Sequence, residues 1–443
     1  MLGAGTRPLS EAIERRTLRF ALAGSICEGL FNGLCSMSAY VAITAMGDWK
    51  KSEGLITSLM GMIPSVLMVL AVVYGSSGRM RKGTRLFMAT AFLGRMIIGA
   101  VALVANPYIF VAVVTIQALV GAGLSPAFNQ IWGANYSTRT RTKFFAINSV
   151  VGWCCTMFGA LAAGLILDAN DGANYVYLYP AAGVIGCLGM VFFSRIRVRY
   201  VTSGGNSRQK APPFWSRFSL AITQTRALLK RDPDFRLYET GFFLYGVAFM
   251  MMQPVIPLLY KHDLAAKYNE FGIANVLIVH LVLMLTAPIV TRALAGKRVT
   301  VVTRMAFLIL TTWPGLLMLA GWLHSIEIAY LACVVHGAGM TFIHFVWNLG
   351  PVQFAKGQSP MPYTSTHAAL VGARASIGYP ISFLLIMLFP DQWLPICALG
   401  TCCLVAAIVL MTVLDRRLRN RMPPPPVERD VTMTMSPIQR RAA

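Results

Sequence analysis

Twelve long apolar stretches run through this chain, and no other feature limits its fold as strongly. They occupy residues 19–45, 54–76, 86–106, 108–132, 143–167, 174–194, 237–260, 271–291, 301–322, 326–350, 366–389 and 392–414. Each is long enough to cross a bilayer, because a helix of about 20 apolar residues spans the hydrocarbon core. Polar backbone groups have no water partner in that core, so a spanning segment of this kind must bond internally as a helix. The sequence therefore predicts an all-α membrane protein with twelve transmembrane helices.

The composition excludes the main alternatives to a membrane protein. Hydrophobic residues make up 56% of the chain and charged residues only 13%, about half the charged share of an ordinary soluble domain. A soluble protein could not bury that much apolar surface, and a disordered chain would be more polar. The net charge of +22 would suit a nucleic-acid binder, but the positions of the charges indicate a membrane orientation instead.

The basic residues divide sharply between the two sides of a twelve-span chain. Arg95 and Arg374 lie within spans, and almost all other Lys and Arg residues fall on the side of the termini. The four on the opposite side are Lys50, Lys51, Lys261 and Lys267. Because basic loops stay in the cytoplasm, we expect a multi-pass protein of the cell (inner) membrane with cytoplasmic N- and C-termini. Its basic surface would contact anionic membrane lipid, and we expect no binding of nucleic acid.

One long polar segment divides the spans into two sets of six. Residues 195–236 are basic and contain paired glycines and paired prolines, which is typical of a linker. The end of the chain carries four consecutive prolines and is predicted to be disordered. We therefore expect an N-terminal six-helix half at 1–194, a cytoplasmic linker at 195–236, a C-terminal six-helix half at 237–415 and a disordered cytoplasmic tail at 416–443.

Short motifs recur in the two halves in the same order. The fourth and tenth spans share a Gly-Ala-Gly sequence followed by Trp, at Gly121–Trp132 and Gly337–Trp347. The second and eighth spans are each followed by an Arg/Gly/Arg motif, formed by Arg79, Gly83 and Arg85 and by Arg292, Gly296 and Arg298. The recurrence predicts two six-helix pseudo-repeats. Such repeats put a substrate site between the halves, near the middle of the membrane.

With this layout and these motifs, the chain resembles the major facilitator superfamily over residues 19–415. Its loop at Gly75–Arg85 keeps the glycine and basic residues of the family's loop but lacks the Asp, and Gln117 stands where the family's fourth-helix motif has Arg. The resemblance implies a transporter in which helices one, four, seven and ten line a central cavity. We expect the two Arg/Gly/Arg loops to act as conformational gates.

Three charged side chains lie within the predicted spans, where a charge is costly and usually faces a cavity or a partner. Glu28, Arg95 and Arg374 fall at a similar depth on the side of the termini, so pairing among them is possible. They are candidates for proton coupling or for ion pairs. Because Glu239 falls at the border of the seventh span, we expect no second carboxylate inside the spans. The net positive interior slightly favours an anionic solute.

Polar and aromatic side chains at helical spacing follow the four helices that line the cavity in the resembling fold. We expect these side chains to bind substrate, although in a single helix such a stripe also serves helix–helix contact. The candidates are Asn32, Gln117, Trp132, Tyr245, Gln253, His336, His344, Trp347 and Asn348. The two histidines either relay protons or bind substrate near neutral pH, or are neutral and bonded to a backbone carbonyl.

Motifs for cofactor, metal or catalytic chemistry are missing from the sequence. It contains no HExxH, CxxC, GxSxG or GxxxxGK[ST] pattern, so we predict no metal site, no cofactor and no enzyme activity. The cysteines mostly lie in spans, where they would pack as small apolar side chains.

Two functions from different classes fit these features. The first is a monomeric secondary active transporter that moves a small polar or amphipathic organic solute by alternating access, with an anionic solute and proton coupling as further expectations. The alternative is a transporter-like membrane receptor or assembly scaffold that no longer transports, which the departures from the family's motifs suggest. A solute that shifts the thermal stability of the purified protein would favour the transporter.

Overall fold

The computed structural model describes residues 11–46, 52–70, 83–197, 214–294, 297–355 and 361–421. Every regular element within these residues is a helix, which confirms the all-α class. Ten helical segments are long and apolar enough to cross a membrane, and two shorter apolar helices, Glu53–Leu67 and Pro107–Gly121, lie at the second and fourth predicted spans. The described helices are therefore consistent with the twelve expected spans.

The N-terminal half contains the helices of the first six spans. They are α1 (Glu11–Leu34) with α2 (Ser38–Thr44), α3 (Glu53–Leu67), α5 (Gly83–Ala89) continued by η2 (Thr90–Arg95) and η3 (Met96–Leu103), α6 (Pro107–Gly121) with α7 (Leu124–Asn135), α8 (Thr138–Asp168) and α9 (Tyr175–Ser194). Several helices are longer than their apolar stretches. α1 and α8, for example, begin within polar sequence, because a helix already formed extends cheaply by one residue at a time.

The C-terminal half repeats this order from the seventh span onward. Its helices are α11 (Pro233–Met252) with α12 (Val255–His262), α13 (Tyr268–Gly272) continued by η4 (Ile273–Ile278) and α14 (Val279–Leu294), α15 (Val299–Trp322), α16 (Ile326–Phe354), α17 (Met361–Leu388) and α18 (Leu394–Asn420). The start of α11 follows from its sequence: the Asp232 carboxylate accepts a hydrogen bond from the Phe235 amide at 3.0 Å, and Pro233 occupies the first turn, which needs no amide donor.

The first and seventh spans are both broken into two helices. α1 and α2 are separated by residues 35–37, and α11 and α12 by Gln253 and Pro254. A proline lacks the amide donor that an uninterrupted helix requires, which accounts for the second break. The matching breaks in equivalent helices agree with the two pseudo-repeats.

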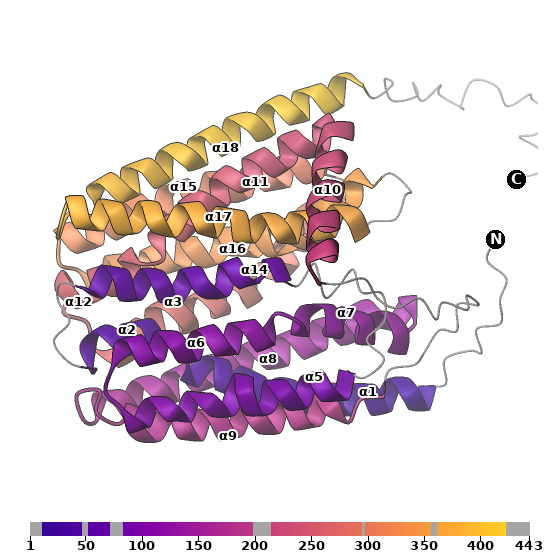
Figure 1. Cartoon of the computed structure of the whole chain (residues 1–443). Coiled ribbons are helices and arrows are strands. Elements are labelled where there is room, and N and C mark those ends of the chain that lie inside the picture. Colours follow the sequence, from indigo (N-terminus) through magenta and orange to yellow (C-terminus); the bar gives the residue numbers. More distant parts are fainter. Residues whose placement is uncertain are drawn as a thin grey trace, which may run out of the picture.

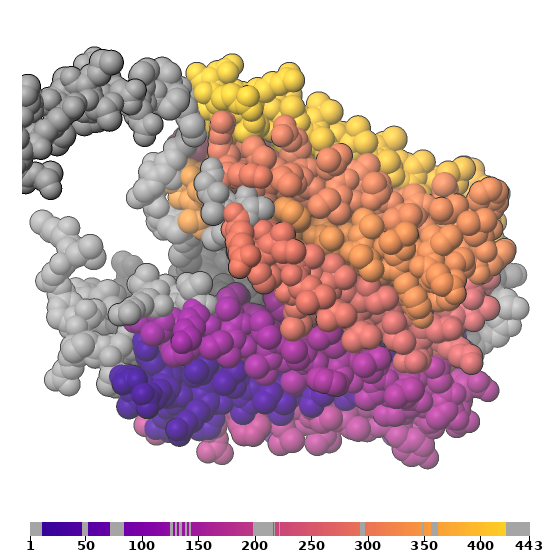
Figure 2. Space-filling view, turned by 180° about the vertical axis from the view of Figure 1, so that it is seen from behind, coloured from indigo at the N-terminus to yellow at the C-terminus, as the bar shows by residue number. Residues whose placement is uncertain are grey.

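The two halves lie side by side as parallel bundles (Figure 1). α1 begins and α18 ends at one end of the bundle, where α10 (Phe214–Arg231) also lies; we call this the linker end. The opposite end, where α2 and α12 lie, is the far end. Figure 2 shows the same two halves in space-filling form, the N-terminal half from indigo to magenta and the C-terminal half from salmon to yellow.

α10 is a helix within the expected linker at 195–236. Its 18 residues run across the linker end, roughly perpendicular to the bundle (Figure 1). The sequence predicted a basic linker but no helix there. Its N-terminal neighbours, residues 198–213, and the tail residues 422–443 lie outside the described part of the chain.

The buried apolar side chains form two cores that both halves share and two that they do not. The larger shared core is at the far end and contains, among others, Tyr40 and Leu167 of the N-terminal half and Met251 and Trp313 of the C-terminal half. The smaller shared core contains Met250 and Tyr379 of the C-terminal half, with Met62 and Val66 of α3 packed against it. Nearer the linker end, one core lies within α1, η2, α5, α7 and α9, and another lies within the helices of the C-terminal half and α10. The two halves are therefore packed together most extensively at the far end.

Candidate functional site

Each half contains a group of charged side chains, half-buried in the N-terminal half and buried in the C-terminal half. In the N-terminal half, Glu28 on α1 and Arg95 at the end of η2 form an ion pair. The Arg95 Nε donates to the second Glu28 carboxylate oxygen at 3.2 Å, and the guanidinium lies 4.5 Å from the centre of the Phe31 ring. Two of the three charges predicted at one depth are thus brought together. The Glu28 carboxylate is occupied on both oxygens by a single arginine.

The third predicted charge, Arg374 on α17, lies in the other half. Its guanidinium Nη2 is 3.8 Å from a carboxylate oxygen of Glu239 on α11. The same carboxylate contacts the Nδ1 atom of His367 at 2.8 and 3.0 Å. All three side chains are at most 2% exposed. The expectation that no second carboxylate lies inside the spans was therefore wrong. Since α11 begins at Pro233, Glu239 sits well inside the helix rather than at its border.

Aromatic rings cover this group, which we call the C-half charge cluster (Glu239, His367 and Arg374). The Trp347 ring lies 4.2 Å from the His367 ring and 5.5 Å from the Arg374 guanidinium carbon. Three nitrogen atoms of the cluster, Nε and Nη2 of Arg374 and Nε2 of His367, have no hydrogen-bond partner among the described residues. A guanidinium can only donate, and a buried donor without an acceptor costs free energy. The cluster therefore keeps hydrogen-bonding capacity that the described residues do not satisfy.

The predicted aromatic and histidine candidates occupy separate places in the bundle. Tyr245 is buried in the core of the C-terminal half, and the His336 ring stacks on Trp313 with centroids 4.3 Å apart. His344 is different, because its ring lies 5.4 Å from that of Trp153 on α8 of the other half. His344 is therefore positioned at the boundary between the halves, whereas His336 packs as an aromatic side chain within one half.

The remaining substrate-binding candidates differ in exposure and in the contacts they form. Asn32 is exposed, Gln253 is half-buried where α11 ends, and Trp132 stacks on a neighbouring tyrosine at 4.8 Å. The Gln117 Nε2 is buried with no hydrogen-bond partner in the described chain. The side chain of Asn348 lies outside what the structure describes.

The described residues include only part of the two expected gate loops. Arg79 and Gly296 lie outside the described residues, and Gly83 begins α5. Arg85 and Arg292 are exposed. Arg298 lies 3.5 Å from Asp415 on α18, within its own half.

A polar cluster that the sequence did not reveal joins the halves at the far end. Glu53 at the start of α3 is 2% exposed. One of its carboxylate oxygens is 2.6 Å from the Lys261 Nζ, and the other is 2.7 Å from the His262 Nε2. Lys261 also donates to the backbone oxygen of Ile43 at 2.5 Å. We call Glu53, Lys261 and His262 the far-end latch, since they link α3 of one half to α12 of the other.

Further hydrogen bonds between the halves surround this latch. The Asp168 carboxylate at the end of α8 accepts from the backbone amides of Tyr268 and Asn269 at 2.8 and 3.0 Å. The Thr44 hydroxyl lies 2.7 Å from the Tyr268 hydroxyl, and Tyr40 donates to a backbone oxygen of the other half. Together with the larger shared apolar core, these contacts close the far end.

Two buried carboxylates at the linker end instead form their hydrogen bonds and ion pairs within one half. Glu14 accepts hydrogen bonds from the Ser137 amide at 2.8 Å and the Thr140 hydroxyl at 2.9 Å, all in the N-terminal half. Asp234 pairs with Arg417 at 3.0 Å in the C-terminal half. These acidic side chains hold each half together without joining it to the other.

The chain is similar in sequence and in structure to one group of known proteins. The sequence profile described as Major Facilitator Superfamily matches residues 24–359, whereas no curated protein sequence matches the chain. Among solved structures, the nucleoside transporter NupG aligns with a TM-score of 0.63 at 13% identity, covering 92% of this chain and 99% of NupG.

Two further solved structures have the same fold. A POT family transporter in complex with 5-aminolevulinic acid gives a TM-score of 0.69 at 16% identity, over 91% of this chain and 96% of the other. The xylose transporter XylE from E. coli, in a partially occluded inward open conformation, gives 0.62 at 14% identity, over 91% of this chain and 98% of XylE. At these identities, the likeness establishes the fold alone.

Proposed function

The chain belongs to the Major Facilitator Superfamily, and on that premise we propose that it is a secondary active transporter that carries a small polar or amphipathic organic solute with an anionic group, in exchange or together with protons. Family membership points to a transporter rather than an enzyme. We further propose that the chain works as a monomer in the inner membrane of a cell, with the basic linker end in the cytoplasm, as the distribution of Lys and Arg favours.

One observation supports alternating access more than any other: the more extensive of the two shared apolar cores is at the far end, whereas two cores nearer the linker end each belong to a single half. A transporter of this design exposes its central site to one side at a time by rocking one half against the other. The far-end latch and the larger shared core close one side. Since the hydrogen bonds and ion pairs of Glu14 and Asp234 at the linker end stay within each half, separation of the halves there leaves these contacts intact.

The C-half charge cluster is our candidate for the site where solute and proton meet. The unpartnered nitrogens of Arg374 and His367 suit a carboxylate or phosphate group, which accepts charge-assisted hydrogen bonds. Glu239 competes with such a group for the same arginine and histidine. Protonation of Glu239 would release both side chains to the solute, which couples uptake of a proton to binding of an anion.

Glu28 is the second candidate for the coupling proton. Its carboxylate is also paired with an arginine, but that arginine is engaged through Nε and Nη2, which leaves less of it free for a solute. We therefore assign solute binding to the C-terminal cluster, and we keep both carboxylates as sites to be tested for coupling.

The test is solute uptake into vesicles that contain the purified protein, with and without a pH gradient. The solutes are 5-aminolevulinic acid, a nucleoside and xylose, which the structural neighbours suggest, together with a series of small carboxylates and organic phosphates. For a transported solute, Glu239→Gln should reduce gradient-driven uptake to the level of empty vesicles. The matched control is Glu327→Gln, since Glu327 is exposed at the far end. Unchanged gradient-driven uptake in both Glu239→Gln and Glu28→Gln would refute the coupling mechanism.

A further inference from the structure

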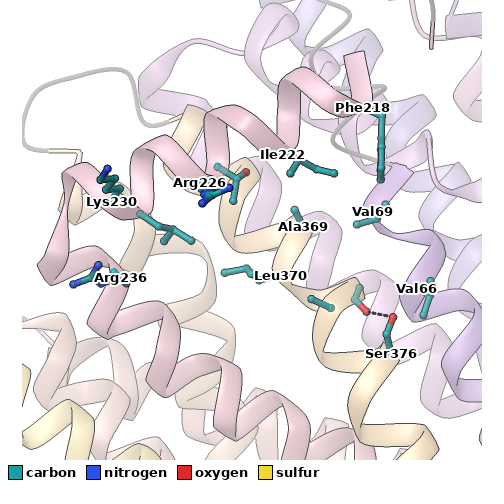
Figure 3. A pocket seen from close by; sticks show the side chains of 14 residues that line it. Val66, Val69, Phe218, Ile222, Arg226, Lys230, Arg236, Ala369, Leu370 and Ser376 are labelled. Carbon is teal, nitrogen blue, oxygen red and sulfur yellow. Dashed lines mark hydrogen bonds between the residues drawn. The ribbon is translucent and has the colours of Figure 1, made fainter. Parts of the chain in front are cut away.

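A large cavity lies at the linker end, and its lining includes no residue of the two charge groups. It has a volume of about 750 Å³ and lies between α10, α17, the end of α3 and the first turns of α11. Figure 3 shows Phe218 and Ile222 of α10 facing Val69, two residues after the end of α3, and Ala369 of α17 across this space. The cavity thus borders helices of both halves.

The walls of the cavity are mostly apolar, and its rim is basic. Val66 at the end of α3 and the nearby Val69 form one wall, and α17 contributes small and aliphatic side chains around Leu370. The basic side chains come from one corner only, where α10 ends and α11 begins: Arg226, Lys230 and Arg236. All three are exposed, and none forms an ion pair with another residue that the structure describes. They are therefore available to an anionic partner.

The sequence of α10 produces this arrangement directly. Phe218, Ile222, Arg226 and Leu229 recur at intervals of three or four residues, so they share one face of the helix, and Lys230 completes it. The face is apolar along its first two turns and basic along its last two. Ile222 is 55% exposed, so its apolar side chain is accessible to an occupant of the cavity.

The position of the cavity limits what could occupy it. α10 crosses the ends of the membrane-spanning helices (Figure 1), at the level where lipid headgroups meet the protein. Ala373 and Ser376 on the α17 wall are exposed. An occupant must therefore combine an apolar portion, which covers α3 and α17, with a negative charge at the α10–α11 corner.

We propose that this cavity binds an anionic phospholipid of the adjacent leaflet, with an acyl chain along α3 and α17 and the phosphate at Arg226, Lys230 and Arg236. The lysine and arginine side chains donate to phosphate oxygens, and the acyl chain removes the apolar walls from water. Because the cavity borders both halves, the bound lipid would connect α3 to α17 and stabilise the two halves in their present arrangement. The proposal does not depend on which solute is transported.

The experiment measures thermal unfolding of the purified full-length protein in detergent with added phosphatidylglycerol or phosphatidylcholine. A ligand that binds only the folded protein raises the unfolding temperature. We expect phosphatidylglycerol to raise it by roughly 2–4 °C more than phosphatidylcholine does. The variant R226Q/K230Q/R236Q should lose this difference. The matched control, R19Q/K143Q/R416Q, removes two exposed arginines and one exposed lysine elsewhere on the linker end and should keep it.

Three further comparisons distinguish binding in this cavity from a general attraction of anionic lipid to the basic surface. Ala373→Trp fills the apolar wall without changing charge and should also reduce the phosphatidylglycerol effect. Glycerol 3-phosphate, which has the charge but no acyl chain, should have no effect. Equal loss in the two triple variants would show that surface charge alone attracts the lipid and would overturn the proposal. An equal effect of the two lipids, or full protection by glycerol 3-phosphate, would overturn it as well.

Discussion

The far-end latch gives the sharpest quantitative prediction. Glu53→Gln keeps the shape of the side chain but removes the charge that Lys261 and His262 share. Removing one partner of a buried ion pair typically costs about 3–5 kcal/mol. The Lys261 and His262 side chains are 25% and 33% exposed, so water recovers part of that cost. We therefore expect about 2–3 kcal/mol for the latch.

The substitution destabilises the closed arrangement of the far end by this amount, because the latch joins α3 to α12 only when the halves meet there. Because a free-energy difference of about 1.4 kcal/mol changes an equilibrium constant tenfold, the population with an open far end should rise by about 30- to 140-fold relative to the closed one. The assay is hydrogen exchange followed by mass spectrometry on α2 and α13, which lie beside the latch. Exchange should accelerate there in Glu53→Gln but not in Glu327→Gln. If exchange in α2 and α13 were unchanged, the latch would not hold the far end closed.

Three further predictions follow, two on the charged groups and one on the close contact between α1 and α8. Arg95→Gln leaves the half-buried Glu28 without its partner and should lower the free energy of unfolding by about 3 kcal/mol; denaturant unfolding checks this, and Glu28→Gln added to Arg95→Gln should recover part of the loss. A Cβ at Gly246 would lie 2.1 Å from the Arg374 Cδ, so Gly246→Ala should displace the arginine and impair solute binding more than folding, as judged by solute-dependent thermal shifts alongside the basal unfolding temperature. A Cβ at Gly33 would lie 2.2 Å from a backbone oxygen of α8, so Gly33→Ala should separate α1 from α8 and lower stability by about 1–3 kcal/mol.

The architecture could be predicted from sequence because a bilayer imposes a simple requirement. Apolar length determined the spans, and each predicted stretch coincides with a described helix. Helix ends were less predictable, since polar residues before Arg19 and after Leu414 continue α1 and α18 as helix. α10 was not anticipated because its mixed apolar and basic residues have the period of a helix but lie in a segment whose glycines and prolines indicate a linker.

The charged groups show where prediction from the sequence was limited. The pairing of Glu28 with Arg95 was one of the possibilities that their similar depth left open. The partner of Arg374 was missed because Glu239 was assigned to a border, and burial depends on where a helix starts within the bundle as well as on sequence. A signal was available: His367 and Arg374 are seven residues apart, which puts them on the same face of one helix two turns apart. The far-end latch had no such signal, because Glu53 and His262 come together only when the two halves pack.

Rocking of the two halves about a central site is tested most directly by distances between the halves at both ends of the bundle. Spin labels on a cysteine-free protein would report one pair at the linker end, Lys143 with Arg292, and one at the far end, Asn170 with Glu327. The four positions are exposed. We predict that Glu53→Gln lengthens the far-end distance and shortens the linker-end distance. Distances that stay the same at both ends, in the variant and across pH, would contradict rocking and favour a rigid scaffold.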